Sequence, residues 1–371
     1  MNKSKSFLSR LRLELFRYFG GFFNIISGRE RILFFKQLAT LLKAGISLTS
    51  SLYILRDQNG SKTLKRILMS VIHDVENGQY LATAFGKFRK TFGELSLNIV
   101  SVGEISGSLS DNLERLVIVL RKQQALRQKI ISASVYPLFI IVATFGITFT
   151  LVVFFFPKII PVLKSVNYSL PITTRFLIFA SDFLKESWLI LLISFTILII
   201  VVYFFLKIKK IRYLFDNFVL SLPFIGKIIK FYNLSNLFRT LGLLENSGVN
   251  VVKSFKITST TTSNLVYKRN LELISDDISK GEKISNQLEK SPKLFTQLSC
   301  QIIRVGEGTG KLSESFLYAS DMYGEELDEI TKNLSVIIEP LLLLFMGILV
   351  GFIAVSIITP IYGITQNINS R

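Results

Sequence analysis

The chain repeats itself at a fixed spacing of 203 residues, and this repeat limits its possible folds more than any other feature. Val102–Leu109 reads V-G-E-I-S-G-S-L, and Val305–Leu312 reads V-G-E-G-T-G-K-L. Other residues match at the same spacing without a gap: Gly45 with Gly248, Asp74 with Asp277, Gly78 with Gly281, Phe92 with Phe295, Ser96 with Ser299, Pro137 with Pro340, and Pro157 with Pro360. Because glycine allows unusual backbone angles and proline fixes φ, both mark positions of special geometry, and unrelated segments would not keep them in register. The chain therefore contains two copies of one unit.

The second motif also resembles a phosphate-binding loop, but its details argue against that interpretation. A P-loop needs four residues between its first glycine and the Gly-Lys pair, followed by Ser or Thr. Here three residues separate Gly306 from Gly310, and Leu312 follows Lys311. The first copy lacks the lysine altogether. The motif is therefore interpreted as a structural part of the repeat.

Each copy carries the apolar spacing of helices. Residues at i, i+4 and i+7 are apolar at the start of both copies: Phe34, Leu38 and Leu41, and their partners Leu237, Leu241 and Leu244. Gly45 and Gly248 follow these helices, where a left-handed cap is needed, and Gly78 and Gly281 follow a later one. Ser110 and Ser313 precede acidic residues and are expected to be N-caps of the last helix. About six short helices per copy are predicted, with no alternating strand pattern.

Three uncharged apolar stretches are long enough to cross a membrane. They are Leu138–Phe156, Trp188–Leu206 and Leu341–Ile358. A hydrocarbon core about 30 Å thick needs about 20 helical residues. The chain is 49% hydrophobic with 19% charged residues, which fits soluble parts joined to membrane spans. The predicted fold class is an all-α integral membrane protein with two homologous helical-bundle domains and three transmembrane helices.

The net charge of +18 could indicate nucleic acid or a membrane as partner. The basic residues do not form one stripe but gather beside the apolar spans, for example Arg121, Lys122, Arg127 and Lys129, and Lys207, Lys209, Lys210 and Arg212. Membrane lipids are therefore expected as partners, and nucleic acid is not. The single Cys300 and single His73 argue against disulfides and Cys- or His-based metal sites. We expect no catalytic residues, cofactor or metal.

The distribution of Lys and Arg predicts a topology with the N-terminus and both copies inside and the C-terminus outside. The predicted organisation is a basic amphipathic segment at 1–30, a cytoplasmic helical domain at 31–135, transmembrane helices at 136–160, 188–206 and 339–360, an extracytoplasmic loop at 161–187, a cytoplasmic linker and second domain at 207–338, and an extracytoplasmic tail at 361–371. The N-terminal segment either rests on the membrane or is loosely ordered. It lacks the features of a cleaved signal peptide.

Several motifs in this order resemble one family. Phe35–Gly45 reads F-K-Q-L-A-T-L-L-K-A-G. The first V-G-E-x-x-G stretch follows, then L-P-F-I-G at Leu222–Gly226, and then the second V-G-E-x-x-G stretch. Over about Arg31 to Gly363 the chain is similar to the type II secretion F-domain family, the inner-membrane platform proteins of type IV pilus, type II secretion and competence machines. It departs from that pattern in a short N-terminal region and in E-N-S-G at Glu245–Gly248, where copy one has L-K-A-G.

The resemblance implies a non-enzymatic scaffold in the bacterial cytoplasmic membrane. Its implied partners are a cytoplasmic hexameric assembly ATPase, a pilin or pseudopilin, other inner-membrane components of the machine, and further copies of itself. The alternative is a small membrane transporter subunit, because transporters are also built from internal repeats. Three spans without a charged residue in their cores argue against that alternative.

Two sets of residues are candidate sites. The repeat-motif set is Gly45, Gly78, Gly103, Glu104, Gly107, Gly248, Gly281, Gly306, Glu307 and Gly310. Gly103, Gly107, Gly306 and Gly310 are expected to allow a tight helix–helix connection, and the glutamates to cap backbone or to pair with a basic residue. A direct ATPase contact is the alternative. The second set is Gly347 and Gly351, spaced for helix packing in the third span, with Thr144 and Thr148 as repeat partners. They are expected to form an oligomer contact or to pack within one chain.

Overall fold

The protein is described by a computed structural model over residues 26–164 and 171–369, and its described elements are all helices. The prediction of an all-α chain is therefore confirmed. Most of the predicted N-terminal segment at 1–30 lies outside the described residues. The chain divides into two units: Met1–Arg127 with Asp216–Leu327, and Gln128–Phe215 with Asp328–Arg371. The first unit holds both copies of the repeat, and the second holds the apolar spans.

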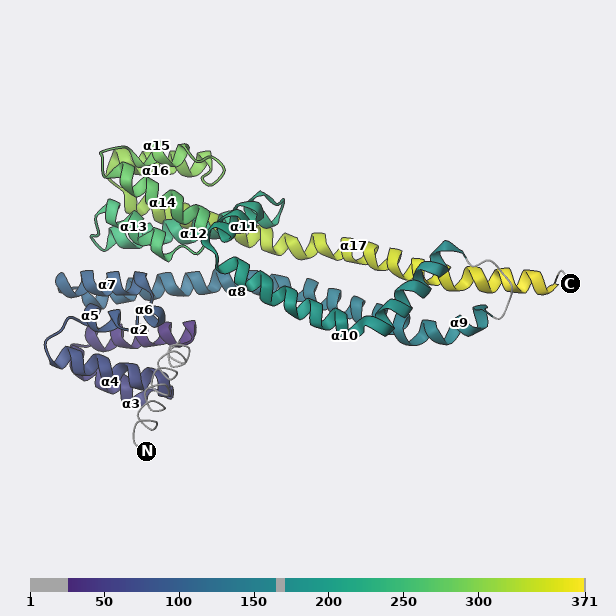
Figure 1. Cartoon of the computed structure of the whole chain (residues 1–371). Helices are drawn as coiled ribbons and strands as arrows, with labels where there is room; N and C mark the ends of the chain where they lie inside the picture. Colours follow the sequence, from purple (N-terminus) through teal and green to yellow (C-terminus); the bar gives the residue numbers. More distant parts are fainter. Residues whose placement is uncertain (1–25, 165–170, 370–371) are drawn as a thin grey trace, which may run out of the picture. The chain divides into compact units, whose positions relative to one another are not determined.

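Copy one consists of six helices and the beginning of a seventh (Figure 1). They are α2 (Gly28–Lys43), α3 (Leu48–Gln58), α4 (Lys62–Glu76), α5 (Leu81–Gly86), α6 (Arg89–Phe92), α7 (Glu94–Ile105) and the first part of α8 (Leu109–Thr150). Serine hydroxyls accept the N-terminal hydrogen bonds of α2, α3 and α4. Four phenylalanines form the centre of the core, with ring centroids 4.2–6.2 Å apart: Phe34, Phe35, Phe85 and Phe92.

Copy two repeats this order after a linker helix, α11 (Lys209–Ser221). Its helices are α12 (Ile225–Asn246), α13 (Val251–Thr261), α14 (Leu265–Ile278), α15 (Ile284–Glu289), α16 (Gln297–Thr309) and the first part of α17 (Leu312–Asn369). Its core is again aromatic, with Phe238 beside Phe295 and Phe316. Phe238 and Phe295 are the repeat partners of Phe35 and Phe92. Two homologous bundles of about six helices, as predicted, are confirmed.

The two copies pack against each other within the first unit. Leu243, Leu244, Val249 and Ile257 of copy two belong to the same buried apolar cluster as the core of copy one. Lys122 of α8 donates to Asp321 of α17 at 2.8 Å, and Arg239 of α12 lies 3.1 Å from the same carboxylate oxygen. Burial raises the pKa of Asp321, but the two cations lower it by more, so it lies below its ordinary value. The copies are therefore joined by both apolar and charged contacts.

The second unit contains the remainder of α8, a π-helical turn at Leu151–Phe155, α9 (Phe156–Lys164), α10 (Ile172–Lys207) and the remainder of α17. Its three apolar stretches are long enough to cross a membrane, which confirms the three predicted spans. None of the stretch Leu189–Lys207 is buried inside the chain, as expected for side chains that face lipid. Buried hydroxyls join the helices, because Thr174 donates to the Ser356 carbonyl at 2.7 Å and Ser181 to the Val152 carbonyl at 2.9 Å.

Some local expectations differ from the structure. Ser110 and Ser313 are not N-caps, because α8 begins at Leu109 and α17 at Leu312. The Ser313 hydroxyl instead donates to the Gly242 carbonyl at 3.0 Å. The segment at 161–187, whose predicted position between two spans stays a prediction, is helical up to Lys164 and again from Ile172. The predicted extracytoplasmic tail at 361–371 is helical as far as Asn369, as a continuation of α17.

Candidate functional site

The first glycine of each V-G-E-x-x-G motif lies in a close contact between two helices. A Cβ atom added at Gly103 would lie 2.9 Å from Leu109 Cα, and one added at Gly306 would lie 2.6 Å from Ser315 Cβ. Real Cβ atoms do not approach other carbons this closely. Glycine is therefore required for the contact of α7 with α8 and of α16 with α17.

The glutamate of each motif caps a neighbouring short helix. The Glu104 carboxylate accepts the N–H groups of Leu81 and Ala82 at 2.6 and 3.1 Å, at the start of α5. The Glu307 carboxylate accepts the N–H of Ile284 at 2.7 Å and the N–H and hydroxyl of Ser285 at 3.3 and 2.8 Å, at the start of α15. Neither short helix has a cap from its own N-cap side chain. The carboxylates thus supply acceptors and negative charge where helix N-termini need them.

The remaining motif glycines adopt the left-handed conformation at helix ends. Their φ angles are 81° at Gly45, 82° at Gly78, 69° at Gly107, 83° at Gly248, 92° at Gly281 and 71° at Gly310. After α2 the N–H groups of Gly45 and Ile46 donate to the carbonyls of Leu42 and Leu41. After α12 those of Gly248 and Val249 donate to the carbonyls of Glu245 and Leu244. Each motif therefore sets one helix against the next and caps a third.

The small residues of the spans are placed differently from one another. Thr144 is buried and donates to the Ile140 carbonyl at 2.7 Å, while Thr148 is partly buried. Gly347 and Gly351 are exposed, and a Cβ atom added at either one would meet nothing within 4 Å. The surface of α17 that packs inside the unit is instead marked by Ile353 and Ser356.

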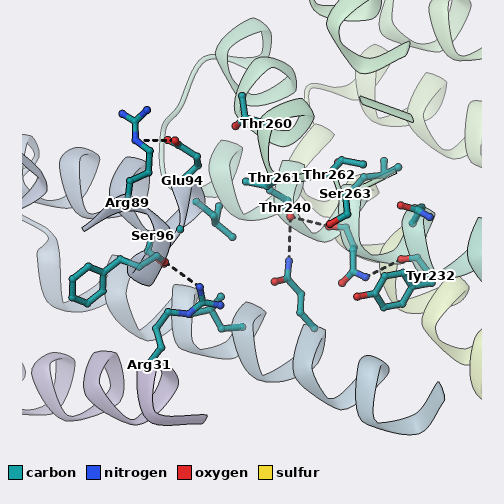
Figure 2. Close-up of a pocket in the computed structure, with 18 residues that line it drawn as sticks. Arg31, Arg89, Glu94, Ser96, Tyr232, Thr240, Thr260, Thr261, Thr262 and Ser263 are labelled. Atoms are coloured by element: carbon teal, nitrogen blue, oxygen red, sulfur yellow. Dashed lines mark hydrogen bonds and ion pairs between the residues drawn. The ribbon is translucent and has the colours of Figure 1, made fainter. Parts of the chain in front are cut away.

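A cavity of about 380 Å³ lies in the first unit, between residues of the two copies (Figure 2). Copy one contributes the start of α7 with Arg31 and Arg89, and copy two contributes Tyr232, Thr240 and the end of α13. The Arg31 guanidinium donates to the Phe92 carbonyl at 3.2 Å, and Arg89 pairs with Glu94 at 2.9 Å. In the described residues, no cluster of three or more metal-ligating side chains occurs.

Sequence reasoning did not find this cavity. The sequence feature that could have indicated it is the set of positions where the two copies differ, because the repeat analysis used only the positions where they match. Gly93 stands where copy two has Thr296, and Leu120 stands where copy two has Tyr323. Both copy-one residues line the cavity, so smaller residues in copy one coincide with open space.

Comparison with known proteins agrees with the duplication. The sequence family described as "Type II secretion system (T2SS), protein F" matches residues 34–157 and again residues 237–360. The two matches are separated by the same 203 residues found in the sequence. The chain belongs to the type II secretion system protein F family. The resemblance inferred from its motifs is thus confirmed, and with its three apolar helices it is a membrane protein.

Individual family members are similar over most of their length. The chain is 34% identical to "Type IV pilus assembly protein PilC" of Thermus thermophilus, covering 91% of this chain and 82% of the relative. It is 30% identical to "Type II secretion system protein F" of Vibrio cholerae, covering 93% and 85%. It is 28% identical to "Protein transport protein HofC homolog" of Escherichia coli, covering 88% and 81%.

We expect Glu307→Ala to destabilise copy two by about 1–2 kcal/mol, because the first N–H groups of α15 lose their acceptor. Glu307→Gln keeps one acceptor oxygen and should lose less. The lone cysteine supplies the measurement, since Cys300 is buried in α16. Its labelling by a thiol reagent should be roughly five to thirty times faster in Glu307→Ala. Unchanged labelling together with a loss of machine assembly would instead indicate a partner contact at this carboxylate.

Proposed function

We propose that this protein is the inner-membrane platform of a type IV pilus or type II secretion-like machine. In this role it couples a cytoplasmic hexameric assembly ATPase to the addition of pilin or pseudopilin subunits. The observation that carries the proposal is similarity over about nine-tenths of the chain to a relative named for pilus assembly. The two family matches at the repeat spacing support it.

The arrangement of the first unit suits a scaffold. The copies share an apolar cluster and the Lys122–Asp321–Arg239 contacts, so a force applied to one copy reaches the other. Helices α8 and α17 begin in this unit and end in the second. Each carries a proline at the same repeat position, Pro137 and Pro340, near the start of its apolar span. A proline weakens the local hydrogen bonding of a helix and so allows bending there.

The same proposal includes a topology and a non-enzymatic role. Both copies face the cytoplasm, where an ATPase can reach them, and residues 161–187 and the C-terminus lie outside. Subunits would be received from the bilayer beside the spans. The repeat-motif glutamates are engaged in capping helices, which fits a role in shaping the platform. A transporter subunit built from an internal repeat is the other candidate, and transport of a solute by the purified, reconstituted chain would favour it.

An affinity purification from membranes tests the proposal most directly. The tagged full-length chain, solubilised in mild detergent after brief cross-linking, should retain an assembly ATPase and a pilin-type subunit that mass spectrometry identifies. Deletion of the gene should abolish surface pili or secretion, and the wild-type gene should restore them. Normal assembly in the deletion strain would refute the proposal.

We further propose that Gly347 and Gly351 form a contact between two copies of this chain. Both glycines are exposed in the second unit, and their spacing allows two helix backbones to approach closely. A cysteine placed by Gly347→Cys, in a Cys300→Ser background, should form intermolecular cross-links in membranes. A cysteine at Ile353, which is buried within the chain, should not. Exclusively intramolecular products at position 347 would refute the contact.

A further inference from the structure

The cavity between the copies contains polar groups that lack partners. Ser96 is only 1% exposed, it lines the cavity, and its hydroxyl has no hydrogen-bond partner. The Nε of Arg31 and the Oδ1 of Asn236 are also buried without a partner, and both residues line the same space. A buried polar group without a partner costs about 1–3 kcal/mol, so native structures rarely leave several in one place. Three such residues line this one cavity, and a bound molecule that supplies the missing hydrogen-bond partners would account for them.

The same cavity receives an uncapped helix N-terminus. Helix α7 has 12 residues, and its N-cap residue is Gly93, which provides no side-chain hydrogen bond. The first N–H groups of α7 therefore have no side-chain acceptor from the cap. The N-terminus of a helix carries a partial positive charge and attracts anions. Gly93, Glu94, Leu95 and Ser96 all line the cavity, so this end of the helix faces open space.

The charges around the cavity leave one cation unbalanced. Arg89 and Glu94 pair with each other at 2.9 Å. Among the ion pairs of the described residues, none includes Arg31. Burial lowers the pKa of the Arg31 guanidinium, but arginine stays charged in proteins. Arg31 is partly buried, with its Nε fully so, and a partly buried cation without a carboxylate partner favours the binding of an anion.

In copy two, side chains satisfy the equivalent helix N-terminus, the start of α16. Thr296, the partner of Gly93, caps α16 through its hydroxyl, which accepts the Ser299 N–H at 3.2 Å. Ser299, the partner of Ser96, donates to the Thr296 carbonyl at 2.7 Å. The Tyr323 hydroxyl bonds to the Thr296 hydroxyl. Copy one has Gly93 in place of Thr296 and Leu120 in place of Tyr323. It therefore lacks both the capping hydroxyl and the phenol hydroxyl of copy two.

We propose that this cavity binds the phosphoryl group of a small molecule, held by the Arg31 guanidinium, the Ser96 hydroxyl and the N–H groups at the start of α7. Three phosphate oxygens match this set of converging donors, and arginine pairs with phosphate through strong charged hydrogen bonds. The volume of about 380 Å³ lies within the range of small-molecule sites, so an organic group fits beside the phosphate. The Oδ1 of Asn236 can accept a hydrogen bond from a hydroxyl or amine of that organic group. Because both copies line the cavity, occupancy would stabilise their packing.

The test uses the purified full-length chain in detergent without phosphate. Equilibrium dialysis with radiolabelled inorganic phosphate and with adenosine monophosphate should give saturable binding. Ser96→Ala should weaken it about tenfold, the typical effect of one hydrogen bond to a charged group. Arg31→Gln should weaken it by at least as much. Tighter binding of the monophosphate would indicate an organic ligand, and equal affinities would indicate free phosphate.

Copy two provides the matched control. Ser299→Ala removes the equivalent hydroxyl from a site already completed by side chains, so it should leave the affinity for phosphate unchanged. A cooperative thermal unfolding transition near the wild-type midpoint shows that each variant remains folded. The proposal is refuted if neither probe binds saturably, or if Ser96→Ala and Arg31→Gln both bind with wild-type affinity.

Discussion

Gly306→Ala will destabilise copy two by about 1–3 kcal/mol, the usual effect of forcing extra volume into a packed contact. The added methyl would lie 2.3 Å from the Ser315 hydroxyl oxygen and 2.6 Å from Ser315 Cβ, with the Lys311 carbonyl at 3.2 Å. Rotation of the serine can move the oxygen away but not its Cβ, so α16 and α17 must separate. Gly308 is the matched control, because it is exposed in the same helix and has nothing within 4 Å of an added Cβ. Gly308→Ala should stabilise α16 by about 0.5–1 kcal/mol.

Cys300 reports both changes directly. It is buried in α16 and is the only cysteine of the chain. When opening is fast relative to labelling, the labelling rate follows the population of the open form. Gly306→Ala should therefore be labelled roughly five to a hundred times faster than wild type, and Gly308→Ala slower. Equal rates in the two variants would show that the first glycine of the motif is not needed for packing.

The duplication made most of the fold predictable. Glycine, proline and apolar residues recurring at one spacing indicated two helical copies, and three uncharged stretches indicated the spans. The sequence did not predict which helix each motif residue contacts or caps. Glu104 caps α5, which begins 23 residues earlier in the sequence, and only the packing of α7 against α5 brings the two together. The N-caps predicted at Ser110 and Ser313 were wrong because local residue preference does not fix the first residue of a helix to within one position.

The cavity was hidden for a related reason. Comparison of the two copies identifies the positions where they agree. The cavity depends instead on positions where they differ, such as Gly93 in copy one and Thr296 in copy two. A glycine in a duplicated helix cap has two interpretations, a turn or an open site. The choice between them depends on the neighbouring side chains, and at this place the deciding neighbours are Leu120 in copy one and Tyr323 in copy two. Residues of copy two complete the cavity wall, and no spacing within copy one predicts them.

The topology should give an all-or-none result in fusion experiments. We expect a green fluorescent protein fused after Leu265 to fluoresce, and the same protein fused after Arg371 to stay dark when the tail is exported unfolded. The reason is the distribution of basic residues, since Lys and Arg beside membrane spans are retained inside. Four basic residues lie close together shortly before the first span and four shortly after the second. The four at 157–187 are spread over a longer stretch, and only Arg371 follows the third span. Alkaline phosphatase at the same two positions should give the opposite activities.

The repeat supports the same topology independently. Each copy is followed directly by an apolar span, so homologous spans should leave the same side of the membrane in the same direction. The second span, Leu189–Lys207, has no partner in the repeat and must return the chain to the first side before copy two begins. With an odd number of spans the two ends of the chain then lie on opposite sides. Fluorescence after Arg371 together with darkness after Leu265 would place both copies outside the cytoplasm, where no assembly ATPase could reach them, and the proposed platform function would have to be abandoned.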